Sequence, residues 1–280
     1  MLLNDPRSHD TATGKDISVI IVNYNARDHL RACLNTLVES PAWPERLEII
    51  VVDNASTDHS EEMVRNHFED IHFIANDSNL GFAAANNQGT RQSRGRYIIL
   101  LNPDTRVPSD ALLQLVNFMD AHPDAAVCGP QLLNPDGSIQ LSCRRFPTLT
   151  AVLIRGTFLS RFLGQSRTMR EYLMLDWDHQ DTRTVDWVLG ACFAMRREAI
   201  AKIGLLDDGF FVYYEDIDWC YRAWRLGWKV YYYPVVSVWH YYQRASSRGI
   251  FSHATRYHLR SIFRLFWKHG FRLNVAPSIQ

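Results

Sequence analysis

The strongest constraint on the fold is a repeated order of apolar strand, polar elbow and helix in the first 125 residues. Here an elbow means the polar residues that follow directly where a strand ends. Apolar runs at 17–22, 47–52 and 96–101 end in the elbows Asn23-Tyr24-Asn25, Asp53-Asn54 and Asn102-Pro103-Asp104. Apolar residues then recur at helical spacing, clearly so between positions 30 and 38. Alternating buried strands and helices predict an α/β fold with a Rossmann-like, mostly parallel sheet flanked by helices.

The elbow at Asp104 lies where such a sheet binds ligands. Ligands of open α/β sheets sit beyond the carboxyl ends of the strands. A carboxylate held there by a rigid strand can bind a hard divalent cation, which would bridge a diphosphate. The alternative is that Asn102-Pro103-Asp104 is only a β-turn followed by a helix cap. No G-x-G-x-x-G follows the first strand and no Walker loop occurs, so a glycine-rich phosphate loop is not expected.

Six segments, in this order, resemble the inverting family 2 glycosyltransferases of GT-A fold: SVIIVNYN, VVDNASTD, NLGFAAANNQG, RYIILLNPDT, WVLGACFAMRREAI and GFFVYYEDIDWCYRAWRLGW. The resemblance covers residues 17–240. Asn102-Pro103-Asp104 in place of DxD, Asn54, and the segment at 144–147 are similar to the rhamnosyltransferase-like branch. The resemblance implies transfer of a sugar, such as L-rhamnose from dTDP-rhamnose, to a glycan or lipid-linked acceptor in cell-surface polysaccharide synthesis.

The resemblance also implies which residues bind the nucleoside diphosphate sugar. Donor contacts are expected from Asn23, Tyr24, Asp53, Asn54, Asn79, Gly81, Phe82, Asn86, Asp104, Arg144 and Arg145. The amide of Asn54 can both donate and accept, so it could read a thymine or uracil imide. For Asn79 and Gly81 a simple turn is the alternative. Arg144 and Arg145 could bind phosphate bidentately, but only one of two neighbours on a strand can face the site.

The acceptor side is expected from the second half of the chain. The resemblance places the general base in the pair Glu215 and Asp216, at Asp216, and acceptor contacts at Trp187, Gly190, Tyr213 and Tyr214. The following Asp218 can be purely structural, because it can pair with Arg222 at i,i+4 in a helix whose dipole stabilises acids in the first turn.

A cation site is implied by the resemblance at Asp104 and His240, for Mg²⁺ or Mn²⁺. A packed or surface histidine is the alternative for His240. Asn102 replaces an acid of the usual motif, so the cation is expected to be held mostly by the diphosphate.

Two other classes of protein remain open. A sugar nucleotidyltransferase uses a similar sheet, but it is expected to carry a Gly-rich loop with Arg and Lys after the first strand, and Asn23-Tyr24-Asn25 is not such a loop. The other class is a catalytically dead sugar-nucleotide or glycan-binding module. The presence of Asp104, Asp216 and His240 together argues against it.

Composition gives the expected compartment. No apolar run approaches the ~20 residues of a membrane span, and residues 1–15 lack the apolar core of a signal peptide, so the chain is expected in the cytoplasm. The five cysteines show no C-x-x-C spacing and are expected to be buried and reduced. Nucleic acid is not an expected partner, and the oligomeric state is left open.

We expect a disordered leader at 1–15, a GT-A catalytic domain at 16–240 and a basic helical extension at 241–280. Within the domain, a nucleotide-binding half would cover about 16–130 and an acceptor-side half about 131–240. The Pro-Asp-Gly turn at 135–137 predicts a hairpin. The segment at 146–181 is interpreted as an insertion over the site, without a readable helix or strand pattern.

The C-terminal extension is strongly basic. Ten Lys and Arg residues, and no Asp or Glu, follow Asp218. A basic amphipathic helix is predicted from the spacing of Arg256, Arg260, Arg264 and Lys268 beside Leu259, Ile262, Phe263, Phe266 and Trp267. Either its apolar face packs on the catalytic domain, or the helix holds the protein peripherally on the anionic inner face of the membrane.

Overall fold

The computed structural model describes residues 15–156, 160–241, 253–271 and 273. Residues 1–14 of the predicted leader lie outside the described residues, as do 242–252, 272 and 274–280 of the predicted extension.

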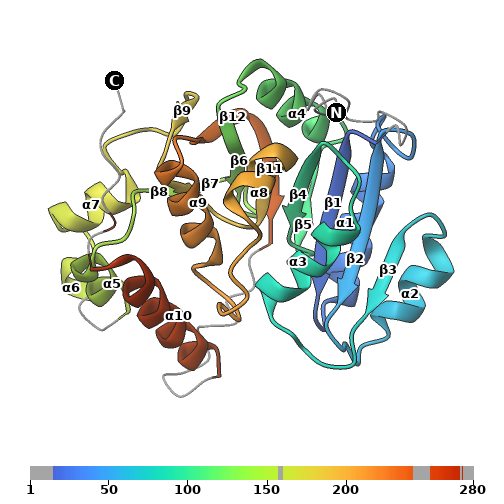
Figure 1. Cartoon of the computed structure of the whole chain (residues 1–280), viewed down its shortest axis with the longest axis horizontal. Helices are drawn as coiled ribbons and strands as arrows, with labels where there is room; N and C mark the ends of the chain where they lie inside the picture. The colour runs from blue at the N-terminus through green and yellow to red at the C-terminus, as the bar shows by residue number, and fades with distance from the viewer. Residues whose placement is uncertain (1–14, 157–159, 242–252, 272, 274–280) are drawn as a thin grey trace, which may run out of the picture.

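Within the described residues, a ten-stranded sheet forms the centre of the fold (Figure 1). Eight of its strands follow one another in the order β3-β2-β1-β4-β11-β6-β12-β5, and two short strands, described below, pair with β6 and β12. The first four strands are parallel, and β12 is parallel to β6, whereas β11 and β5 run antiparallel to their neighbours. These strands are β1 (Ile17–Asn23), β2 (Leu47–Asp53), β3 (His72–Ala75), β4 (Tyr97–Leu101), β5 (Thr105–Arg106), β6 (Ala125–Leu133), β11 (Cys192–Arg196) and β12 (Lys229–His240). The predicted mostly parallel sheet is confirmed.

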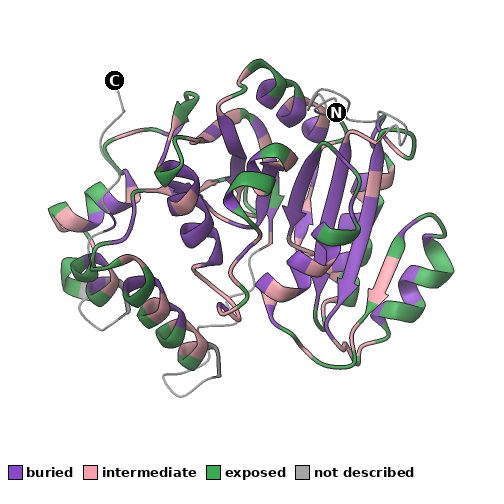
Figure 2. Ribbon diagram, in the orientation of Figure 1, coloured by how far each residue is buried: buried purple, intermediate pink, exposed green. Residues whose placement is uncertain are grey.

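The sheet is buried on both faces, which explains why its central strands are continuously apolar (Figure 2). Along β1, Val19 and Ile21 belong to one hydrophobic cluster and Ile20 and Val22 to the other, because successive side chains point to opposite faces. The first cluster is covered by α1 (Arg27–Val38), α2 (Ser60–His67) and α4 (Ala111–Ala121). The second is covered by α3 (Phe82–Gln92), α8 (Arg197–Ile203) and α9 (Glu215–Arg225).

Smaller elements complete the acceptor-side half. The predicted hairpin is present, since β7 (Ile139–Gln140) pairs with the end of β6 after a turn in which Gly137 has φ 82°. A separate ribbon joins β8 (Cys143–Arg144) to β10 (Trp187–Val188), and β9 (Arg183–Thr184) pairs with β12. The segment without a readable pattern contains α5 (Leu149–Gly156), α6 (Ser160–Leu163) and α7 (Arg167–Leu173).

The predicted C-terminal helix is α10 (His253–His269). Its residues Leu265 and Phe266 are buried against the rest of the protein. Among the helices in the described part of the chain, none combines the length and the apolar character that a membrane span requires. All five cysteines are free, and all are buried, as expected from the sequence.

Candidate active site

The first two elbows are locked together at the carboxyl edge of β1 and β2. The parallel register brings Asn23 opposite Asp53. Asn23 Nδ2 donates to Asp53 Oδ1 at 2.7 Å, and the Asn54 backbone N–H donates to the Asn23 carbonyl at 2.8 Å. The other oxygen of Asp53 accepts the backbone N–H of Ser56 at 2.8 Å. Both predicted donor elbows therefore form one hydrogen-bonded unit.

Asn54 connects this unit to the loop before α3. Its Nδ2 donates to the Gly81 carbonyl at 3.2 Å, and its Oδ1 accepts from Asn76 Nδ2 at 3.0 Å. An amide oxygen has two lone pairs and an amide nitrogen two protons, so each end keeps capacity for a ligand. Asn79 Oδ1 accepts the Gly81 N–H at 2.9 Å. Asn79 and Gly81 therefore form a turn, which was the alternative to a donor contact considered from the sequence.

Gly81 is required by its conformation and by its surroundings. Its φ is 87°, and a Cβ at this position would come within 2.5 Å of the Phe211 carbonyl oxygen. The next residue, Phe82, donates its backbone N–H to that carbonyl at 2.6 Å. This contact ties the donor side to the loop that enters α9. Deeper in α3, Asn86 Nδ2 donates to the Phe82 carbonyl at 2.9 Å, whereas its buried Oδ1 has no hydrogen-bond partner among the described residues.

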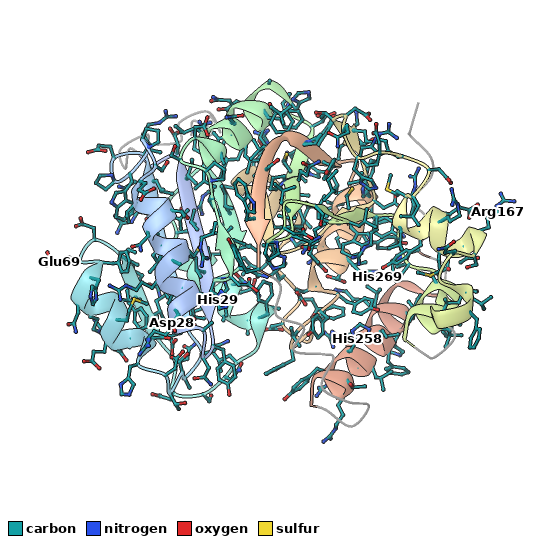
Figure 3. All side chains as sticks on the ribbon, turned by 180° about the vertical axis from the view of Figure 1, so that it is seen from behind. Asp28, His29, Glu69, Arg167, His258 and His269 are labelled. Atoms are coloured by element: carbon teal, nitrogen blue, oxygen red, sulfur yellow. The ribbon has the colours of Figure 1, made fainter. Side chains whose placement is uncertain are left out.

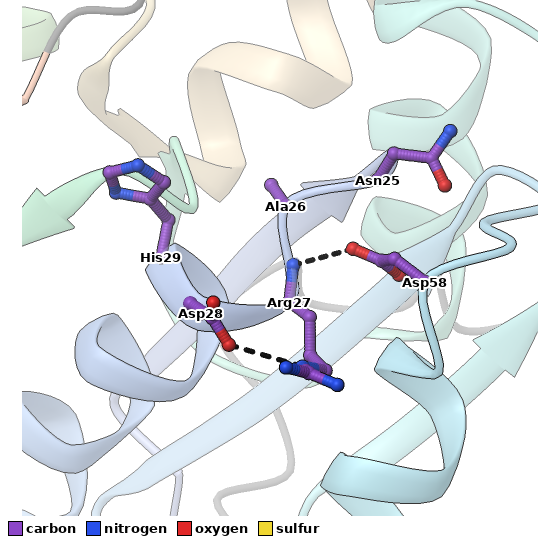
Figure 4. Close-up of a pocket in the computed structure, with 6 residues that line it drawn as sticks. All are labelled: Asn25, Ala26, Arg27, Asp28, His29 and Asp58. Atoms are coloured by element: carbon purple, nitrogen blue, oxygen red, sulfur yellow. Dashed lines mark hydrogen bonds and ion pairs between the residues drawn. The ribbon is translucent and has the colours of Figure 1, made fainter.

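An open pocket of about 440 Å³ lies beside the first elbow and the start of α1 (Figure 4). It is lined by Asn25, Ala26, Arg27, Asp28, His29 and Asp58. The Arg27 backbone N–H donates to Asp58 Oδ2 at 2.8 Å, which already satisfies this helix N-terminus. The preceding Tyr24 is 53% exposed, as a side chain that stacks on a ligand would need to be.

Asp104 and His240 meet at the edge where β5 pairs with β12. His240 Nε2 lies 3.3 Å from Asp104 Oδ1 and 3.3 Å from Asn102 Nδ2. Burial alone would raise the pKa of Asp104, but the adjacent imidazole outweighs burial and lowers it, so Asp104 is held as a carboxylate. The charge of His29 contributes to the same lowering of the Asp104 pKa.

Gln140, which the sequence did not single out, orients His240. His240 Nδ1 lies 2.7 Å from Gln140 Oε1. The amide orientation is fixed because Gln140 Nε2 donates to Asn134 Oδ1 at 3.0 Å. Nδ1 therefore carries a proton toward Gln140, and Nε2 is the ring nitrogen that faces Asp104.

A carboxylate oxygen and an imidazole lone pair that converge in this way fit a divalent cation. Among the described residues, no group of three or more His, Cys, Asp or Glu side chains is placed to hold a metal ion. The residues present therefore suit a cation that takes most of its ligands from a bound diphosphate.

The acidic pair Glu215 and Asp216 begins α9 and is buried. Burial and the adjacent Asp216 carboxylate raise the pKa of Glu215 well above its usual range, and Glu215 Oε2 has no hydrogen-bond partner in the described structure. Burial also raises the pKa of Asp216, but the backbone N–H groups of Gly190 and Ile217 donate to its two oxygens at 3.1 and 2.8 Å and oppose the rise. Of the two acids, Asp216 is the one equipped to ionise.

Asp216 lies close to the donor side. A Cβ on Gly190 would be 3.7 Å from Asp216 Oδ2 and 3.8 Å from Phe82 Cε1, so these three residues are neighbours. The residue after Gly190, Ala191, accepts the backbone N–H of Asn102 at 2.9 Å. The base candidate and the cation candidates therefore approach each other across the junction of β4 and β11.

The two predicted arginines diverge. Arg144 lies over the Trp187 ring at 5.2 Å, and its charge lowers the pKa of Asp216, which places it on the site side. Arg145 is directed to Asp186, at 3.3 Å. Trp187 itself is buried and donates from Nε1 to the Arg145 carbonyl at 2.8 Å, so it supports Arg144 rather than offering an open surface to an acceptor.

Tyr213 and Tyr214 stand in an unusual backbone conformation just before α9. Their φ values are 68° and 72°, a left-handed region that costs bulky residues energy and that clusters at functional sites. His258 of α10 packs against both rings, at 5.5 and 5.2 Å between centroids (Figure 3). The loop that presents the predicted acceptor residues is therefore supported by the C-terminal helix.

This sheet order and its covering helices define the GT-A fold. Solved structures of the same fold include GalNAc-T7 with UDP, GalNAc and Mn²⁺, with a TM-score of 0.66 and 17% identity. The match covers 91% of this chain and 49% of the GalNAc-T7 chain, so this chain spans about half the length of that protein. The mannosyltransferase PcManGT from Pyrobaculum calidifontis, in complex with GDP-Man and Mn²⁺, has a TM-score of 0.63 and 20% identity over 96% of this chain and 68% of that chain.

The chain belongs to glycosyl transferase family 2, whose family model matches residues 18–204. It is 28% identical to the N-acetylglucosaminyl-diphospho-decaprenol L-rhamnosyltransferase of Mycobacterium tuberculosis, over 91% of this chain and 85% of that protein. It is also 28% identical to the rhamnosyltransferase WbbL of Escherichia coli K12, over 89% of this chain and 91% of that protein.

Proposed function

We propose that this protein is an inverting, metal-dependent transferase that moves L-rhamnose from dTDP-rhamnose to a lipid-linked glycan in cell-surface polysaccharide synthesis. The observation that carries this proposal is the approach of Asp216 to the donor edge through Gly190, Ala191 and Asn102. The sugar and the lipid-linked acceptor are supported by the relatives, two of which are rhamnosyltransferases, one of them named for a decaprenol diphosphate glycan. Residues 16–240 would form the catalytic domain and work at the cytoplasmic face of the membrane.

The donor would lie along the three elbows. Asn54 would face the pyrimidine edge, since its amide keeps one donor and one acceptor function for a ligand. Tyr24 would lie against the nucleoside. Arg144 would contact the diphosphate or the sugar, because its charge is near enough to lower the pKa of Asp216 and it lies over the Trp187 ring, whereas Arg145 pairs with Asp186.

Asp104 and His240 would hold Mg²⁺ or Mn²⁺ together with the diphosphate, and Gln140 would hold the Nδ1 proton of His240 so that Nε2 is the nitrogen turned toward the cation. The bound cation would neutralise the charge that develops on the leaving diphosphate. Asp104 is already a carboxylate at neutral pH. Cation binding would therefore have to displace only a proton of His240 or the hydrogen-bond donors around this residue.

Asp216 would be the general base. It would take the proton of the acceptor hydroxyl as that oxygen attacks the anomeric carbon, and the bond from that carbon to the diphosphate would break on the opposite face, which inverts the anomeric centre. The hydrogen bonds from Gly190 and Ile217 keep its oxygens oriented and favour its ionised form. Glu215 would remain protonated beside it.

The proposal is tested with a panel of dTDP and UDP sugars, measured for donor hydrolysis and for transfer to a polyprenyl diphosphate-linked N-acetylglucosamine. We expect turnover of dTDP-rhamnose that stops in EDTA and returns with Mg²⁺ or Mn²⁺. Binding of donors without turnover would favour the catalytically dead module. Formation of a nucleoside diphosphate sugar from sugar phosphate and nucleoside triphosphate would favour the nucleotidyltransferase.

A further inference from the structure

One face of α10 presents a continuous row of large apolar side chains to solvent. Leu259, Phe263 and Trp267 are four residues apart and are 61%, 72% and 77% exposed, and Phe271 just beyond the helix is 69% exposed. Residues spaced i,i+4 lie on one side of a helix. Single exposed apolar residues are ordinary on protein surfaces, but a contiguous row of this size marks an interaction surface.

The row is not what attaches α10 to the protein. Attachment comes from the opposite side, where Leu265 is buried, Tyr257 stacks on Phe211 at 4.2 Å and Ser261 Oγ donates to the Val212 carbonyl at 2.9 Å. Phe266, at the edge of the row, is also buried. The helix therefore has two apolar faces. One face packs on the rest of the protein, as one of the two alternatives from the sequence expected, and the row on the other face is largely exposed.

The basic residues of α10, which the sequence places at a spacing of four, divide into two groups in the structure. Arg264 and Lys268 lie 2.6 and 2.7 Å from the carboxylate of Asp207, because α10 docks on the loop that carries this acid. Arg256 and Arg260 are exposed. Only these two remain to give the outer face its charge.

Exposed large apolar residues also occur on the short helices α5 and α6. Leu149 and Leu153 of α5 and Phe162 and Leu163 of α6 are exposed large apolar residues. Figures 1 and 3 draw α5 and α6 beside α10, and buried residues of α5 and α10 belong to the same hydrophobic cluster. Neither residues 149–163 nor residues 219–280 contain an Asp or Glu.

We propose that this outer face of α10, together with α5 and α6, docks on an anionic lipid bilayer, with Leu259, Phe263 and Trp267 entering the interface. Apolar and aromatic side chains beside arginines, without acids, match the chemistry of such a surface. A second copy of the chain is a poorer match, because a symmetric contact would bring two cationic, acid-free faces together.

Docking would place the acceptor loop at the membrane. The inner side of α10 contacts Phe211 and Val212, and His258 packs on Tyr213 and Tyr214. If the acceptor is lipid-linked, its sugar end would meet this loop close to the bilayer surface. That consequence rests on the proposed function, whereas lipid binding itself does not.

The test is flotation of the full chain with vesicles of pure phosphatidylcholine or of phosphatidylcholine with 30% phosphatidylglycerol, without donor or acceptor. We expect binding to the anionic vesicles that weakens as salt is raised. Replacing Leu259, Phe263 and Trp267 by Gln should abolish it. Replacing Arg256 and Arg260 by Gln should weaken it about 30-fold, since each basic residue near an anionic surface contributes up to about 1 kcal/mol.

Two control variants carry the same kinds of substitution, apolar to Gln and Arg to Gln, at exposed positions outside α10. Leu226→Gln with Val235→Gln changes residues of 57% and 66% exposure, and Arg31→Gln with Arg91→Gln removes exposed charges from α1 and α3. Both controls should bind vesicles normally. Circular dichroism and donor hydrolysis, which needs no lipid acceptor, verify that each variant is folded and separate this proposal from the proposed function.

Equal binding to neutral and anionic vesicles, or unchanged binding of the triple Gln variant, would overturn the proposal. So would a wild-type dimer in light scattering that the triple Gln variant converts to a monomer, because a second copy would then occupy this face.

Discussion

Replacing Asp216 by Asn removes the proposed proton acceptor while keeping the size of the side chain. Asp216 accepts two backbone N–H groups, and the Asn carbonyl can keep only one of them, so the variant should lose about 1–3 kcal/mol of stability through one unsatisfied N–H. The chemical step should slow by about 10² to 10⁴-fold, which is the range for a positioned general base. That loss corresponds to about 3–5 kcal/mol of transition-state stabilisation.

The assay is single-turnover transfer at saturating donor and cation, which separates chemistry from product release. Donor affinity, measured by calorimetry, should stay nearly unchanged. In the wild type, activity should fall on acidification at a pH above the ordinary pKa of aspartate, because burial raises the pKa of Asp216 and the protonated acid cannot accept another proton. Glu215→Gln is the matched control and should keep most of the rate.

Near-normal turnover in Asp216→Asn, with Glu215→Gln inactive, would refute this reasoning and move the base by one residue. Loss of donor binding in step with the rate would instead assign Asp216 to donor binding.

Three further predictions follow from the geometry. Gln140→Leu removes the acceptor that orients His240. The Mg²⁺ or Mn²⁺ concentration needed for half-maximal activity should therefore rise about 10 to 100-fold, and an unchanged cation titration would contradict this. Glu215→Gln should reduce the fall in stability that the wild type shows as pH rises above about 4.5, because the raised pKa of Glu215 makes the folded state hold a proton that the unfolded chain releases. Part of the fall should remain, since burial also raises the pKa of Asp216. Parallel urea-unfolding stabilities of the two proteins from pH 5 to 8 would refute this. Arg144→Gln should raise the donor KM about 10 to 100-fold and Arg145→Gln should change it little, and the reverse order in steady-state kinetics would exchange their roles.

The sequence predicted the central strands because their signal is local. β1, β2 and β4 are buried on both faces, so each is a continuous apolar run that ends in polar residues. β3 was missed, since this edge strand has exposed residues at both ends, His72 and Ala75, and lacks such a run. The Pro-Asp-Gly hairpin was found because turn chemistry is also local.

The site was less predictable because its contacts join distant parts of the chain. Gln140 lies on a strand of two residues, and only the pairing of β7 beside β6 and β12 brings it to His240. Helical periodicity placed Arg264 and Lys268 on one face of α10. It could not reveal that this face packs against Asp207, which pairs with both. The roles of Asp104, Asp216 and His240 remain predictions, supported by the geometry and tested by the substitutions above.

The ion cluster around Asp218 has a consequence for how the protein is made. Asp218 is fully buried in α9, and its partners are Arg222 on the same helix and Lys268 and His269 on α10, at 2.9, 2.7 and 2.6 Å. Chains emerge from the ribosome N-terminus first, so the strands of the proposed donor site can fold well before α10 exists. Until α10 docks, Asp218 has only Arg222 to balance its charge. The ion cluster that supports the helix of the proposed base is thus completed only after the strands of the proposed donor site have been synthesised.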